Sequence, residues 1–270
     1  SFTLSYFPQD WRMLVTALGS NVDGGSPSPY THVISEINSA SGAPFTSGAM
    51  NPFTSYTLEA SAKGAATGEN FIRTLVGCNT NTWTLNASQG EILSVDVDGM
   101  AQDVIFTSGA ITAPTEETTR PFLWRDVKVH IPSGTVVPEF KTMTFSVNNN
   151  LEVAHYLNGS QVSEAFKPLG RDYELSLTAD ATSENTKTFW ETRFVGGSML
   201  QQGTGSEFNV MIEINASTGS RDAFFILSGC KLLDFSLPLP QEGVNESSVT
   251  IRPKNCVVSI NDLTFQYNPY

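Results

Sequence analysis

One pattern of residues recurs along the chain at a constant offset of 152 positions, the separation of Cys78 and Cys230. Residues 56–78 align with residues 208–230 without a gap, and Leu75, Gly77 and Cys78 have identical counterparts in the second copy. Recurrence over such a window indicates one supersecondary unit that occurs twice. The 270 residues are therefore expected to contain two copies of one fold unit.

The match extends upstream, where residues 2–5 and Gly19 correspond to residues 174–177 and Gly197. The offset at the two glycines is 178, so the first copy carries 26 more residues ahead of the repeated strand. These fall within residues 21–51, a stretch rich in Gly, Ser, Pro and Ala, and such long loops are usually either functional or disordered. The functional interpretation predicts an arm that contacts a partner subunit through its apolar residues, which are Tyr30, Val33, Ile34, Ile37 and Phe45.

The repeat also predicts the domain organisation. We expect a first domain at residues 1–111, a linker at residues 112–119 and a second domain at residues 120–270. The second copy opens with residues 121–170, which have no counterpart ahead of the first copy. This difference predicts a parent protein with about 50 further N-terminal residues, either cleaved or not visible here.

Alternation of apolar and polar residues at period two dominates the chain and predicts strands with one buried face. Residues 142–147 alternate in this way, and the three asparagines at 148–150 predict a turn, so residues 141–157 are expected to form a long hairpin. Helical spacing appears in residues 11–18 after Asp10 and in residues 186–194. The predicted class is all-β with short flanking helices.

Composition excludes several classes of function. Lys and Arg number 15 against 27 Asp and Glu, a formal net charge of −12, which argues against tight binding to nucleic acid but not against contact without binding. No apolar run approaches the length of about 18 residues that a membrane span needs. Three cysteines without a CxxC pair predict buried, reduced thiols.

Candidate catalytic or metal-binding residues are few. His32, His130 and His155 lie far apart in sequence without a recognised motif, and the two on predicted strands are expected to face solvent. Asp96 and Asp98 would share one face of a strand that ends in a turn at Asp98-Gly99. That pair could bind calcium or act as glycosidase carboxylates, but solvated structural carboxylates are the favoured interpretation. The sequence predicts no enzyme, no metal and no cofactor.

Several segments resemble the tail tube proteins of long-tailed bacterial and archaeal viruses, of siphovirus or myovirus type. The resemblance is carried by loose β-hairpin signatures at residues 75–78, 83–85, 90–96, 121–124, 145–152 and 158–160. It implies two tandem β-sandwich or barrel domains and subunits that join into stacked rings around a channel for viral DNA. Because 3 × 2 = 6, three chains would give six quasi-equivalent units around the axis.

The resemblance also implies partners and a location. The partners would be other copies of the chain and other tail proteins, such as the tape measure, the tail terminator and the baseplate or tip. DNA would pass without binding, no membrane would be involved, and the virion tail would be assembled in the host cytoplasm. If the predicted hairpin and neighbouring strands line the channel, the lumen-facing residues are Asp96, Thr142, Thr144, Ser146 and Glu152.

The alternative function is a secreted carbohydrate-binding or adhesin module, because acidic β-sandwiches rich in Thr and Asn are common in that class. An adhesin repeat should be separable by a linker, whereas only residues 112–119 connect the two copies here. Electron microscopy distinguishes the two functions, since rings or tubes favour the tail tube and monodisperse globules favour the adhesin.

Overall fold

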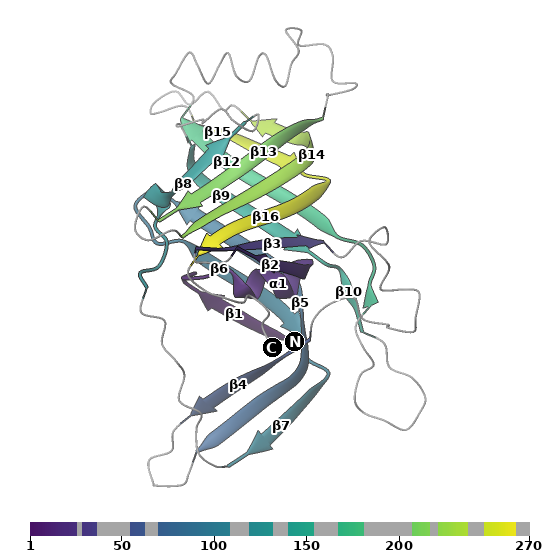
Figure 1. Cartoon of the computed structure of the whole chain (residues 1–270). Helices are drawn as coiled ribbons and strands as arrows, with labels where there is room; N and C mark the ends of the chain where they lie inside the picture. The colour runs from purple at the N-terminus through teal and green to yellow at the C-terminus, as the bar shows by residue number, and fades with distance from the viewer. Residues whose placement is uncertain are drawn as a thin grey trace.

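The computed structural model of the chain describes residues 1–25, 29–36, 55–62, 70–108, 119–131, 140–153, 167–180, 207–216, 221–236 and 246–262. Within these ranges the fold is almost entirely β (Figure 1). The first half contains β1 (Phe2–Tyr6), α1 (Arg12–Leu18), β2 (Gly19–Gly24), β3 (Tyr30–Glu36), β4 (Tyr56–Ala62), β5 (Phe71–Ser88), β6 (Ser94–Met100) and β7 (Asp103–Thr107). The second half contains the 3-10 helix η2 (Trp124–Asp126), β8 (Val127–His130), β9 (Phe140–Asn148), β10 (Leu151–Glu152), β11 (Lys167–Pro168), β12 (Asp172–Asp180), β13 (Phe208–Asn215), β14 (Asp222–Ser236), β15 (Glu246–Arg252) and β16 (Asn255–Asp262).

The strands form two large sheets and a projecting arm. Sheet A has the order β1, β6, the second half of β5, β9, β12, β15 and the second half of β14. Sheet B has the order β8, β13, the first half of β14, β16, β3 and β2. The arm consists of β4, the first half of β5 and β7, and it extends away from the body of the molecule (Figure 1).

Strand pairing follows the sequence repeat at its offset of 152 residues. Tyr56 pairs with Cys78 as Phe208 pairs with Cys230. Corresponding pairs recur throughout the two units: Leu75 with Val104 and Leu227 with Cys256, Trp83 with Val97 and Phe235 with Val249. Even the irregularities correspond, since the register shifts between Thr80 and Thr82 in one unit and between Leu232 and Asp234 in the other.

Two equivalent glycines mark the points where the long strands pass from one sheet to the next. Gly77 in β5 has φ 64° and Gly229 in β14 has φ 61°, a left-handed conformation that a side chain disfavours. The thiols of the following cysteines, Cys78 and Cys230, each donate to the carbonyl three residues earlier, at 3.4 Å and 3.5 Å. The identical Leu, Gly and Cys of the repeat are therefore the residues that form each bend.

Register corrects the upstream alignment by one residue. Leu4 pairs with Val97 and Leu177 pairs with Val249, so Leu4 is equivalent to Leu177. The match of residues 2–5 with residues 174–177 is therefore wrong by one position, because it makes apolar residues of one copy equivalent to polar residues of the other. A shift of one residue moves every side chain of a strand to the other face, so pairing decides this alignment.

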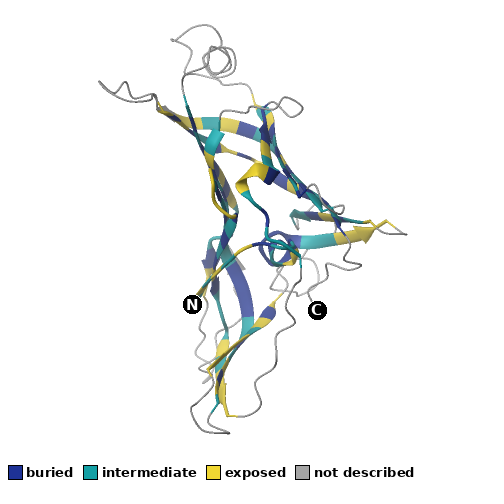
Figure 2. Ribbon diagram, turned by 90° about the vertical axis from the view of Figure 1, so that its left-hand side faces the viewer, coloured by how far each residue is buried: buried dark blue, intermediate teal, exposed yellow. Residues whose placement is uncertain are grey.

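A single core cluster contains residues from both halves of the chain. Trp11 stacks on Phe122 with ring centroids 5.2 Å apart and meets the edge of Phe225 at 5.2 Å. The ring centroid of Trp83 lies 6.3 Å from that of Phe225 and 6.5 Å from that of Phe145. The cluster takes buried residues from strands of both sheets, and Figure 2 shows buried positions in dark blue along these strands. The boundaries at residues 111 and 119 remain a prediction, because the described sheets and core extend across both halves.

The first predicted helix is confirmed, with one difference in its burial. Asp10 supports its start, since Asp10 Oδ1 accepts the backbone N–H of Arg12 at 3.0 Å, and Gly19 ends it with φ 97°. The helix is not simply amphipathic, because five consecutive residues from Leu14 to Leu18 are buried between the strands. The predicted helix at residues 186–194 lies outside the described residues.

The predicted hairpin at residues 141–157 is wrong as a pairing. Within it, β9 pairs with β5 on one side and β12 on the other, whereas β10 pairs with β11. The turn itself is confirmed, because Asn150 has φ 46°. The side-chain amide of Asn149 donates to the carbonyls of Ala17 and Thr80, both at 3.0 Å, and so directs the chain away from a hairpin. Tertiary hydrogen bonds to β5 and α1 outcompete local hairpin closure.

Residues 119–126, between the two halves, contain a partly buried ion pair in which Asp126 is buried and Arg120 is partly exposed. Arg120 donates to both carboxylate oxygens of Asp126, at 2.7 Å and 3.1 Å, and the N–H of Leu123 donates to Oδ2 at 2.9 Å. Burial alone would raise the pKa of Asp126, but these hydrogen bonds outweigh it and the pKa is lowered. The ionised carboxylate therefore stabilises this connection.

Replacing Gly229 with Ala should reduce the free energy of unfolding by about 1–2 kcal/mol, because of the positive φ. The new Cβ would also lie 2.9 Å from Cβ of Lys254. Gly170→Ala is the control, since a Cβ there meets nothing within 4 Å. Urea unfolding followed by tryptophan fluorescence measures both variants. Equal stability of the two variants would contradict the assigned bend.

Asp126→Asn should lower the free energy of unfolding by about 2 kcal/mol at neutral pH, because it leaves Arg120 without its carboxylate partner. The pKa of Asp126 is lower in the folded state than its ordinary 3.8, so the stabilisation is present above that value and is lost as pH falls through the folded pKa. Unfolding measured at about pH 7 and about pH 3 should show the difference between wild type and variant shrinking at the lower pH. A difference independent of pH would exclude this origin.

Candidate assembly surface

Sheet A presents a continuous polar face on the side opposite the core. Directly paired residues in an antiparallel sheet share a face, so the registers define its rows. Six strands contribute to it, and none of the positions in these rows is an apolar residue. The rows are Ser5, Asp96, Thr84, Ser146 and Glu174; Thr3, Asp98, Thr82, Asn148 and Asp172; Ser94, Asn86, Thr144, Ser176 and Thr250; and Ser88, Thr142, Thr178 and Ser248.

Hydrogen bonds between neighbouring strands order the side chains on this face. Asp96 accepts from the hydroxyl of Ser5 at 2.6 Å and from the amide of Asn86 at 2.9 Å. Asn86 in turn accepts from the hydroxyl of Thr144 at 3.1 Å, which connects β1, β6, β5 and β9. Asp98 accepts from Thr3 at 2.8 Å. These carboxylates are therefore engaged across the sheet.

The charge on the face is mainly negative. Asp96, Asp98 and Glu174 lie in its rows, and their carboxylates point to the side away from the core. Arg252 lies two residues beyond Thr250 on β15 and forms an ion pair with Asp172. That contact lowers the pKa of Asp172, so this carboxylate stays ionised at neutral pH.

Four of the five predicted lumen residues lie together on this face. Asp96 is on β6, and Thr142, Thr144 and Ser146 are on β9. Thr84 of β5 pairs with both Asp96 and Ser146 and so connects the two strands. Glu152 does not join them, because β10 pairs with β11 outside sheet A.

Sequence reasoning missed the contributions of β1, β12 and β15 to the face. The polar positions Thr3 and Ser5 alternate with apolar ones, as do Ser176 and Thr178, so the signal was present in the sequence. What the sequence did not show was that β9 lies between β5 and β12 and brings these strands into one sheet. The predicted turn at Asp98-Gly99 is also wrong, since β6 continues to Met100.

The described part of the predicted loop at residues 21–51 is a β-hairpin of β2 and β3. It adds to β16, with Ile34 paired to Val258 and His32 paired to Ile260. Ile34 is fully buried in the core of its own chain, so its side chain is not a contact for a neighbour. Tyr30 and Val33 also lie on β3, and contact with another subunit through them remains a proposal; Ile37 and Phe45 lie outside the described residues.

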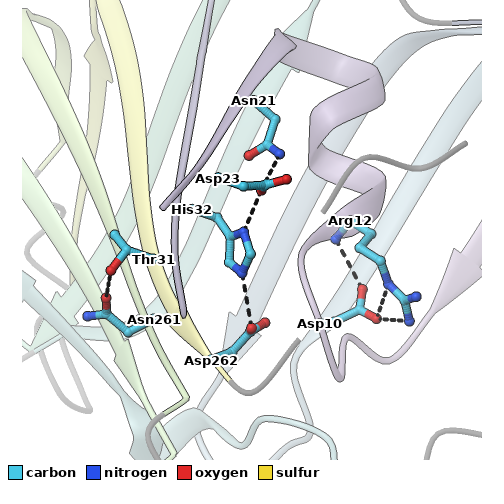
Figure 3. Close-up of polar contacts among 8 residues, drawn as sticks. All are labelled: Asp10, Arg12, Asn21, Asp23, Thr31, His32, Asn261 and Asp262. Atoms are coloured by element: carbon cyan, nitrogen blue, oxygen red, sulfur yellow. Dashed lines mark hydrogen bonds and ion pairs between the residues drawn. The ribbon is translucent and has the colours of Figure 1, made fainter. Parts of the chain in front are cut away.

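A buried histidine fastens this hairpin to β16 (Figure 3). Nδ1 of His32 lies 2.7 Å from Asp23 Oδ1 on β2, and Nε2 lies 3.2 Å from Asp262 Oδ1 on β16. A neutral imidazole carries one N–H, so both contacts are hydrogen bonds only when the ring is protonated. Next to it, Thr31 donates to Asn261 at 3.1 Å. The contacts connect a segment of the first copy to β16 in the second.

The other candidate chemical groups are structural. His130 is buried rather than solvent-facing, and its Nε2 lies 3.0 Å from Glu213. His155 lies outside the described residues. Burial raises the pKa of the Cys230 thiol to about 11, so the thiol is protonated at neutral pH and is a poor nucleophile. Among the described residues no group of three His, Cys, Asp or Glu could hold a metal ion, and no helix could span a membrane.

The family model for phage tail tube proteins matches residues 1–264 of the chain. The chain belongs to the phage tail tube protein family. A search of curated proteins finds no match. Tail tube proteins are structural components of the virion tail, which agrees with a β-rich chain and confirms the resemblance noted in the sequence. The all-β fold class is confirmed as well.

For this tail tube protein, His32→Ala should reduce the free energy of unfolding by about 3 kcal/mol. The substitution leaves the carboxylates of Asp23 and Asp262 without their shared partner and creates a cavity. Thr31→Val on the same strand is the matched control, because it removes one partly buried hydrogen bond and should cost about 1 kcal/mol. Urea unfolding measures both, and a smaller loss for His32→Ala than for the control would contradict the role of the histidine.

Proposed function

We propose that the chain assembles into stacked rings that form the hollow tail tube and conduct viral DNA. The observation that carries this proposal is the polar face of sheet A, to which both repeats contribute strands. An antiparallel sheet that packs on a core by one face normally presents a polar face to water on the other, and a wide face of Ser, Thr, Asn and carboxylates suits the wall of a water-filled channel. A channel with few cations does not hold phosphates by counterion release, so DNA passes without binding.

Ring formation follows from the arrangement of sheet A. β1 is equivalent to β12 through the shared register of Leu4 and Leu177. The second side of β12 pairs with β9, which joins the two repeats, whereas on its second side β1 pairs with no strand in the described ranges. An exposed strand edge invites pairing with another chain. The other border of sheet A is the second half of β14, which pairs with β15 and with no further strand among the described residues. Three chains joined head to tail, β1 of one to β14 of the next, would place six repeats around the axis and close the sheet into a ring.

Assembly with other tail proteins follows from membership of the family. Specific contacts with the tape measure, terminator and baseplate or tip belong to this proposal, as does assembly in the host cytoplasm. Each partner would meet an end or the interior of the tube. The carboxylates of the polar face would also repel the phosphates of the DNA. This repulsion would act over about 8–10 Å, the Debye length in physiological salt.

Negative-stain electron microscopy and sedimentation of the purified protein test assembly. We expect rings or tubes with apparent sixfold symmetry and a mass of three chains per ring. A monodisperse monomer at every concentration, with no ring in the images, would contradict the proposal.

Charge reversal tests the channel wall. Glu174→Lys combined with Thr144→Lys puts two cations on the polar face and should slow DNA ejection from particles by about threefold or more at low salt, with tubes still assembled. The effect should weaken at high salt because the charges are screened. Glu207→Lys combined with Asn209→Lys is the control, since both residues are exposed and the pair makes the same charge change at the start of β13 in sheet B. Unchanged ejection with intact variant tubes would exclude sheet A from the lumen.

A further inference from the structure

The three strands of the arm have equivalents in sheet B, but their outer edges are paired differently. The arm strands β4, β5 and β7 correspond to β13, β14 and β16 at the offset of 152 residues. In the second unit both outer edges are paired inside the chain, β13 with β8 and β16 with β3. In the arm β4 and β7 each pair with β5, and no strand among the described residues pairs with their outer edges.

Side chains of the arm are exposed where their equivalents are buried. Phe106 on β7 is 61% exposed, whereas its equivalent Val258 is fully buried. Phe71 on β5 is 55% exposed, and its equivalent Ala223 is fully buried. The rings of Phe71 and Phe106 lie 5.6 Å apart, so they form one apolar patch near the end of the arm.

The edge strand beside this patch is apolar as well. Ile105 on β7 is 47% exposed, and Thr74 and Leu75 of β5 pair with Ile105 and Val104 from the inner side. Proteins usually protect such an edge with charges, a bulge or a covering segment. Here β7 has a carboxylate only at its first residue, Asp103, and Phe106 and Thr107 follow Ile105 without a charge.

We propose that a strand of a second copy of this chain pairs with the outer edge of β7 and covers Phe71 and Phe106, in the position that β3 occupies on β16. The argument for a second copy is the internal equivalence. Within the chain, the edge of β16 in the second repeat is covered by β3, a strand of the first repeat. The equivalent edge of β7 in the first repeat would then be covered by a strand from the second repeat of a neighbouring copy. Main-chain hydrogen bonds at the edge and burial of the two rings would stabilise this contact.

This inference rests on the proposed assembly into tubes, where it assigns the arm a role between subunits. The pairing would connect the arm of one chain to the body of another, so the arm would become part of a continuous sheet. It differs from closure of sheet A at β1, because β7 lies at the far end of β5 from the strands that contact β9.

Photo-crosslinking in the full chain tests the contact directly. We replace Phe106 with the photoreactive amino acid benzoylphenylalanine, irradiate the assembled protein and identify the joined peptides by mass spectrometry. The expected result is a covalent dimer in which residue 106 is joined to a peptide of a second chain. A variant that assembles into tubes but crosslinks only within its own chain would overturn the inference and leave the proposed function intact.

Absence of any assembly, together with absence of the covalent dimer, would overturn both proposals. A covalent dimer through residue 106 without tubes would support the arm contact and contradict the tube. The two failures are therefore distinguishable in one set of samples.

A matched pair of substitutions provides the second test. Ile105→Lys places a charge on β7, whose outer edge pairs with no described strand. Val257→Lys places the same charge at the equivalent position of β16, which is paired on both sides. Ile105→Lys should raise the protein concentration required for assembly by about tenfold or more, with an unchanged circular dichroism spectrum. Assembly by folded Ile105→Lys at the wild-type concentration would overturn the inference.

Discussion

Every strand edge of a sheet must be paired, covered or protected, and this requirement explains most of the architecture. The two repeats cannot meet it separately. β9 enters between β5 of the first repeat and β12 of the second, and the β2–β3 hairpin of the first repeat adds to β16 of the second. As a result the repeats share one core around Trp83, Phe145 and Phe225.

The same requirement connects fold to assembly. Pairing among the described residues leaves β1 and the arm at the borders of the sheets. Their equivalents β12 and β16 pair with β9 and β3 on the corresponding sides, whereas no described strand pairs there with β1 or β7. A structural protein of the phage tail can use such borders as joints, since subunits that complete each other's sheets bury backbone donors and acceptors that would otherwise remain with water. Folding and assembly then depend on one kind of interaction.

The polar face of sheet A follows from the period of the β-strand. Alternation places Trp83, Phe145 and Leu175 toward the core, and it therefore places Thr84, Ser146 and Glu174 on the opposite side. Pairing aligns those polar positions across strands into rows, which no single strand provides. The hydrogen bonds of Asp96 with Ser5 and Asn86 then order the carboxylates against the sheet rather than leaving them free to bind a cation.

Local patterns in the sequence determined the strands, the first helix with its glycine end, and four residues of the polar face. These features depend on side-chain period and on backbone conformation, which neighbouring residues specify. Only the tertiary structure decided that β9 pairs with β5 and β12, that β2 and β3 pair with each other and add to β16, and that His32 and His130 are buried. The physical reason is that pairing partners far apart in the chain compete with local turns, and the outcome depends on the total of hydrogen bonds and apolar surface that each arrangement buries.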